Sequence, residues 1–110
     1  MPQAASSPES RRAPREAIDC PSRIWSAALP PSPALIVNVS PHGCMIRSDR
    51  SVRIGERIGV DVPSIGALHG PVIWSLGARF GIEFENAIEL EPYVAMLSLL
   101  KGSFDAQSFA

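Results

Sequence analysis

The chain contains 110 residues, of which 45% are hydrophobic and 19% are charged, and its formal net charge is −1 at pH 7. This length predicts a single domain, and the near-neutral charge argues against a general nucleic-acid binder, which carries a strongly basic surface. Two cysteines are too few for a disulfide framework. Because neither a signal peptide nor a membrane-spanning run is visible, we expect a cytoplasmic protein without membrane insertion.

The N-terminal segment divides into two parts of different composition. Residues 1–10, MPQAASSPES, are small and polar, so we expect a disordered tail that buries too little apolar surface to become ordered. Residues 11–16, RRAPRE, are charged, and Pro14 disfavours helical geometry at the residue before it. An extended segment should therefore lead into a first strand at residues 17–28.

Short β-branched or alternating runs, separated by turns rich in proline and glycine, predict five further strands. We expect them at residues 34–39, 43–48, 57–62, 69–75 and 78–85, with LPPSP at 29–33 as a turn. The last strand places Phe80, Ile82 and Phe84 on one face, because the strand period is two. Trp25 and Trp74 are expected in the core or at a barrel end, with stacking of one of them on a base as the alternative.

The hydrophobic spacing changes near the C-terminus. In residues 91–102, EPYVAMLSLLKG, the apolar side chains follow the i, i+3, i+4, i+7 pattern of a helix; they are Tyr93, Met96, Leu97 and Leu100. Pro92 suits the first turn of this helix and Gly102 its end, which leaves residues 103–110 as a C-terminal tail. Six short strands and one helix predict an all-β fold, a six-stranded antiparallel barrel with a C-terminal helix over one end.

Three arginines, Arg11, Arg12 and Arg15, stand close together near the N-terminus. In an extended chain Arg11 and Arg15 share a face, with their backbones about 13 Å apart at roughly 3.3 Å per residue. Guanidinium groups bind phosphate bidentately and stack on planar bases, so this pair suits a ligand with two anionic groups. Taken alone, the arginines favour a solubilising tail, and the choice depends on a second motif.

That second motif is NVSPHG at residues 38–43, directly after the apolar run ALIV. Strand alternation places Asn38 and Ser40 on the same face. An amide can bind the donor and acceptor edge of a base, and a hydroxyl can bind a phosphate or a base. Gly43 permits a positive φ and close approach of the backbone to a ligand. Together the two motifs predict a site for a phosphorylated small molecule that contains a base.

The two motifs together resemble the bipartite signature of the PilZ domain family: Arg11-x-x-x-Arg15, then a strand, then Asn38-x-Ser40-x-x-Gly43. The stretch GPVIWSLGARFGIEF is also similar to the closing strands of that family. The resemblance implies a PilZ-type barrel over residues 11–102 that binds the second messenger cyclic di-GMP. The family often has aspartate at the position of Asn38, and asparagine keeps the acceptor oxygen but loses the charge.

The resemblance also implies a role for each residue of the signature. Arg11 and Arg15 would hold phosphates and stack on guanine, and Asn38 would contact a guanine edge. Ser40 would bind a phosphate or a base, and Gly43 would give access to the backbone.

Two other kinds of site find little support in the sequence. His42, His69, Cys20 and Cys44 lack the spacing of a zinc site, so no metal is expected, and Cys44 is better explained as a small core residue. Ser40 and His42 do not form a catalytic triad, so no enzymatic activity is expected.

We therefore expect a non-enzymatic cyclic di-GMP receptor without another cofactor, in which the N-terminal arginine arm closes on the ligand. Arg12 has no fixed role in the signature and either adds charge to this site or points to solvent. The surface formed by arm, ligand and barrel would then engage an unidentified downstream protein. The alternative is a PilZ-like protein-protein interaction module that binds no nucleotide and acts through its surface alone.

Overall fold

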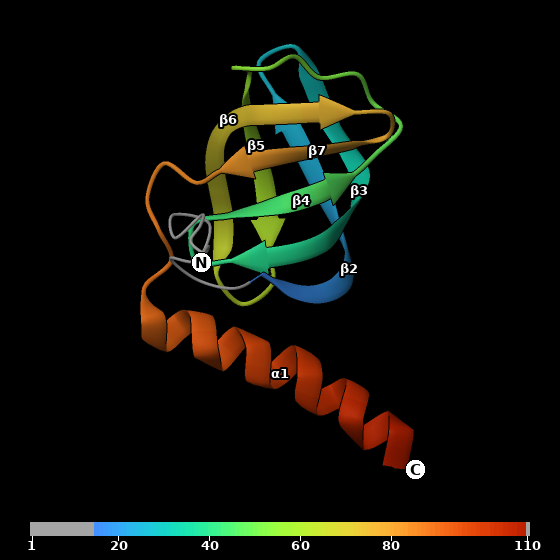
Figure 1. The fold of residues 1–110 in the computed structure, drawn as a ribbon, viewed down its shortest axis with the longest axis vertical. Helices are drawn as coiled ribbons and strands as arrows, with labels where there is room; N and C mark the ends of the chain where they lie inside the picture. The colour runs from blue at the N-terminus through green and yellow to red at the C-terminus, as the bar shows by residue number, and fades with distance from the viewer. Residues whose placement is uncertain (1–14, 110) are drawn as a thin grey trace, which may run out of the picture.

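The computed structural model describes residues 15–109, and the side chains of residues 15–100. Six antiparallel strands form a closed barrel in the spatial order β2-β3-β4-β7-β6-β5, and one helix follows (Figure 1). The elements are β2 (Glu16–Ser26), β3 (Leu29–Ser40), β4 (Gly43–Arg47), β5 (Arg57–Val62), β6 (Gly66–Leu76), β7 (Arg79–Glu83) and α1 (Leu90–Phe109). The predicted barrel with a C-terminal helix is confirmed, whereas the tail predicted at residues 1–10 lies outside the described residues.

The start of β3 differs from the prediction. LPPSP, residues 29–33, forms the first part of this strand, and the turn lies at residues 27 and 28 instead. Over this part β3 pairs with β2, with Pro33 opposite Arg23, whereas pairing with β4 begins only at Leu35. Proline is tolerated in a strand segment that is paired on one side, because its missing N–H can face away from the ladder. The predicted turn was therefore wrong.

The helix begins with Pro92 in its first turn, as predicted, but it continues past Gly102 to Phe109. A glycine inside a helix costs about 1 kcal/mol relative to alanine and does not by itself end the helix. The predicted end at Gly102 was therefore wrong, and the segment expected to be a tail is helical up to Phe109. In the part of the chain that the structure describes, no helix has the length and apolar character needed to cross a bilayer.

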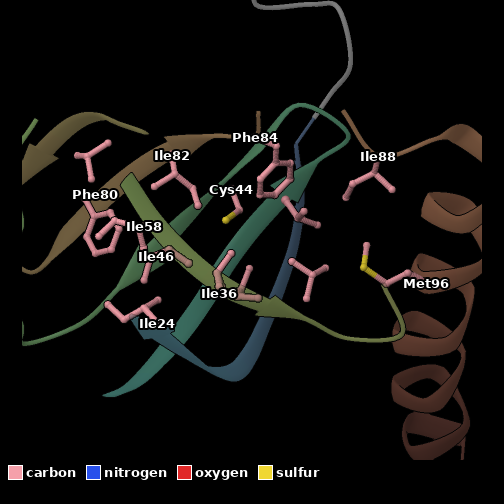
Figure 2. Close-up of a cluster of buried hydrophobic side chains, with 14 of the residues drawn as sticks. Ile24, Ile36, Cys44, Ile46, Ile58, Phe80, Ile82, Phe84, Ile88 and Met96 are labelled. Atoms are coloured by element: carbon pink, nitrogen blue, oxygen red, sulfur yellow. The ribbon is translucent and has the colours of Figure 1, made fainter. Parts of the chain in front are cut away.

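The core fills the barrel and extends to the helix (Figure 2). The predicted face of Phe80, Ile82 and Phe84 is buried, with exposed fractions of 2%, 0% and 6%. Cys44 is fully buried among the isoleucines, as predicted for a small core residue. Met96 of α1 is fully buried against the same cluster, so the helix packs on the barrel through the predicted apolar stripe.

Both tryptophans lie on the outer face of the barrel, each over a glycine of the neighbouring strand. Trp25 pairs with Gly59 and Trp74 with Gly81, and a Cβ on either glycine would collide with the indole ring. The expectation of core or barrel-end packing was therefore wrong. An aromatic ring that covers a cross-strand glycine shields backbone that would otherwise be exposed, which is why a large ring is stable outside the core.

Candidate functional site

Asn38 and Ser40 lie on the outer face of β3. Val39, between them, is fully buried in the core, so its two neighbours point to the opposite side. Ile36 is also buried, and strict alternation from it would turn Asn38 inward. A register shift between Ile36 and Asn38 adds one residue to β3 at this point and reverses the alternation. The predicted common face of Asn38 and Ser40 therefore depends on an irregularity that was not predicted.

Arg15 reaches this face from the segment that precedes β2. Its Nη1 donates a hydrogen bond to Oδ1 of Asn38 at 3.1 Å. The backbone register explains the contact, because Ala17 pairs with Asn38 and the chain before Ala17 continues alongside β3. Two residues that are 23 positions apart are thus joined directly, one from each predicted motif.

Arg11 and Arg12 lie outside the described residues, so their predicted contacts stay predictions.

Ser40 ends β3 and stabilises the turn that follows. It is 5% exposed, and its Oγ accepts a hydrogen bond from the backbone N–H of His42 at 3.2 Å. The turn is held further by Phe84, whose N–H donates to the carbonyl of His42, and by Ile88, whose N–H donates to the carbonyl of Pro41, both at 2.8 Å. Among the side chains and backbone of residues 15–100, the Ser40 hydroxyl donates to no acceptor, so its proton can be donated to a ligand.

Gly43 is required for a reason other than the one predicted. Its φ is not in the left-handed region, so the expectation of a positive φ at this position was wrong. A Cβ here would stand 3.3 Å from Glu83 Cα and under 3.0 Å from the carbonyl oxygen of Ile82. Glycine therefore allows β4 and β7 to approach closely, and it leaves the first residue of β4 without a side chain on the face beside Ser40.

The helix is attached to the same strand. The hydroxyl of Tyr93 donates a hydrogen bond to the carbonyl oxygen of Val39 at 3.2 Å, between the two site residues. Burial, and then the negative charge of Glu16, raises the pKa of Tyr93, so the phenol stays a neutral donor at ordinary pH. The position of β3 at the site is therefore fixed from the core side by α1.

The thiol beneath this face is inert. Burial raises the pKa of Cys44 to about 12, and the positive charge of Arg15 opposes that shift only in part. A neutral buried thiol is neither a nucleophile nor a metal ligand. Within residues 15–109, no group of three or more histidine, cysteine or acidic side chains could hold a metal ion.

An apolar platform borders the site. The sequence alone did not predict this platform. Across the outer face, Asn38 pairs with Met45, Met45 with Gly81, and Gly81 with Trp74. The amide Nδ2 of Asn38 donates weakly to Sδ of Met45 at 3.9 Å. The indole ring over Gly81 therefore lies in the same cross-strand row as Asn38. Trp74 and Gly81 lie at equal sequence distances from the turn at residues 77 and 78. This spacing in the sequence could have predicted that the two residues pair across the hairpin.

Comparison with known proteins supports the motif analysis. The model of the PilZ domain family matches residues 9–101, which include both motifs and all six strands. No curated protein matches the chain. PilZ domains are cyclic di-GMP-binding modules and are typically non-catalytic. Since the match covers most of the chain, this protein belongs to the PilZ domain family.

Proposed function

We propose that this protein is a receptor for cyclic di-GMP that binds the ligand on the outer face of β3 and β4. The hydrogen bond between Arg15 and Asn38 carries the proposal, because it brings the two motifs together beside Ser40 and Gly43. A cyclic dinucleotide presents two phosphates and two bases. A guanidinium, an amide and a hydroxyl on one outer face of the barrel match that combination of groups.

Each side chain has a separate task in the proposed complex. Arg15 exchanges its bond to Asn38 for a phosphate, which frees the amide for a guanine edge. Ser40 donates its hydroxyl proton to a phosphate oxygen, and Gly43 lets the ligand approach the start of β4. Arg11 and Arg12 would add positive charge from the segment that precedes the described residues.

The energetics favour a complex in which several contacts form together. Ordering about five arm residues costs on the order of 5–10 kcal/mol. Each charge-assisted hydrogen bond returns about 1.5–3 kcal/mol, and each stacked base about 1–3 kcal/mol. We therefore propose that the arginine arm closes over the bound ligand, and we expect a dissociation constant in the micromolar to sub-micromolar range.

Isothermal titration calorimetry with cyclic di-GMP tests the proposal. Wild-type protein should give a saturable heat that Arg15→Ala and Ser40→Ala remove. Arg23→Ala is the matched control, because Arg23 is also an exposed arginine but pairs with Asp61 at 3.3 Å, outside the proposed site. A folded wild-type protein that gives no more than the heat of dilution would overturn the receptor and support the interaction module without nucleotide.

Two further readouts separate the parts of the proposal. Backbone amide signals of residues 11–13 and 15 should shift in NMR spectra at saturating cyclic di-GMP, and unchanged signals would contradict arm closure. Chromatography of the dinucleotide after incubation should show no conversion, and a product would contradict a non-enzymatic receptor.

A further inference from the structure

The end of the barrel remote from α1 carries three chain connections (Figure 1). A hydrogen bond of 2.8 Å from the N–H of Ser48 to the carbonyl of Ala78 joins two of them. We call this surface the loop end and define it by residues 27–28, 47–56 and 76–79. It lies apart from the candidate nucleotide site, because Gly43 and Arg47 are at opposite ends of β4.

The guanidinium groups of four loop-end arginines have no carboxylate partner among the side chains of residues 15–100; they belong to Arg47, Arg50, Arg53 and Arg79. The register places Arg47 directly opposite Arg79 on β4 and β7. Like charges in that position destabilise a sheet, so local folding does not explain the pair. Only two carboxylates, Asp49 and Glu56, belong to the loop end, although the whole chain has a net charge of −1. Positive charge is therefore concentrated here.

Large aliphatic side chains stand at two turns of the same end. Ile54 is 69% exposed and Leu76 is 79% exposed. Each precedes a glycine with positive φ, 91° at Gly55 and 62° at Gly77, so each stands at a tight turn. A single exposed aliphatic residue requires no explanation. Leu76, however, pairs with Arg79, so it lies in one cross-strand row with the arginine pair and places an apolar side chain beside two positive charges.

The loop end also holds a polar hollow that fits a small anionic group. Its volume is about 350 Å³, and its polar lining residues are Ser48, Asp49, Arg50, Ser51 and Ser75. Hydroxyl groups next to a guanidinium can bind a phosphate. The hollow lies between the loop of residues 48–56 and the turn at residues 77 and 78.

We propose that the loop end is a peripheral docking surface for an anionic phospholipid bilayer. The four unpaired arginines would bind lipid phosphates, and Leu76 and Ile54 would enter the boundary between headgroups and acyl chains. An acidic protein partner fits less well, because protein interfaces concentrate their apolar residues in a central patch, whereas these two occupy separate turns. Binding through side chains requires no membrane-spanning segment, and it does not depend on the nucleotide.

Co-sedimentation of the full chain with lipid vesicles tests this proposal. Vesicles of 40% phosphatidylglycerol and 60% phosphatidylcholine should bind the protein in 0.1 M salt, and pure phosphatidylcholine vesicles should not. The double variant Arg47→Gln/Arg79→Gln should weaken binding by about 20- to 30-fold, since each basic side chain near an anionic surface contributes a factor of about five. Leu76→Ser should weaken binding while the salt dependence stays unchanged.

Arg23→Gln is the matched control, because it removes one exposed arginine outside the loop end and should bind like wild type. Circular dichroism and thermal melts verify that each variant is folded. Equal binding of wild type and the double variant, or no sedimentation of wild type with anionic vesicles, would overturn the proposal. Binding of wild type to polyglutamate but not to vesicles would overturn it in favour of an acidic protein partner.

Discussion

Gly43→Ala tests whether close packing of β4 against β7 positions the candidate site. The added Cβ would stand under 3.0 Å from the carbonyl oxygen of Ile82 and 3.3 Å from Glu83 Cα, and both neighbours are backbone atoms. Overpacking of this kind costs roughly 1–3 kcal/mol. The less flexible unfolded chain of the variant offsets about 0.4–1 kcal/mol of that cost. The midpoints of these two ranges differ by about 1.3 kcal/mol, a net loss that should lower Tm by roughly 5–10 °C for a domain of this size.

Differential scanning calorimetry measures this shift, and cyclic di-GMP titration of the same variant measures its effect on the site. Because the strands must separate at Gly43, the adjacent Ser40 should move and binding should weaken as well. Gly77→Asn is the control, since a Cβ there meets nothing within 4 Å and asparagine tolerates the φ of 62°. A Gly43→Ala variant that melts within about 2 °C of wild type would refute the steric explanation of this glycine.

Two substitutions and one thiol-labelling experiment address the site and its support. Asn38→Asp should tighten cyclic di-GMP binding by about 5- to 10-fold in calorimetry, because a carboxylate accepts two guanine donors more strongly than an amide does; unchanged affinity would contradict the assigned contact. Tyr93→Phe should lower the free energy of unfolding by about 1–2 kcal/mol in urea titrations, since the carbonyl of Val39 loses its donor. Ellman's reagent should label Cys20 in the native protein but Cys44 only after unfolding. Burial raises the pKa of Cys44 from its ordinary value of 9.0 to about 12. The contribution of this neutral thiol to the free energy of unfolding is therefore complete below pH 9.0 and is lost as the pH rises toward about 12.

The sequence predicted best the features that depend on local periodicity. Ile82 and its neighbours at spacing two are buried, because one side of β7 faces the core along its whole length. Met96 is buried, because an amphipathic helix has a single apolar face. The predicted turn at residues 29–33 failed, because a strand paired on one side tolerates proline. Local composition cannot reveal how many neighbours a strand has.

The site required information that only the closed barrel contains. Asn38 points outward because a register shift follows Ile36, and no local pattern in ALIVNV indicates it. The need for glycine at position 43 arises from a strand almost forty residues later in the chain. The contact of Arg15 with Asn38 likewise depends on the pairing of β2 with β3. Motif spacing therefore identified the residue types, whereas the tertiary structure determined their orientation and neighbours.

The attachment of the site to the C-terminal segment limits how a ligand signal can be transmitted. The carbonyls of Val39, Pro41 and His42 all accept hydrogen bonds from the segment between Phe84 and Tyr93. The end of β3 and the turn after it are held at three points and resist displacement, so binding should change the covered surface and the arginine arm more than the barrel. Hydrogen exchange of α1 amides should therefore stay nearly unchanged when cyclic di-GMP saturates the protein. A large change in α1 would instead show that the helix transmits the signal.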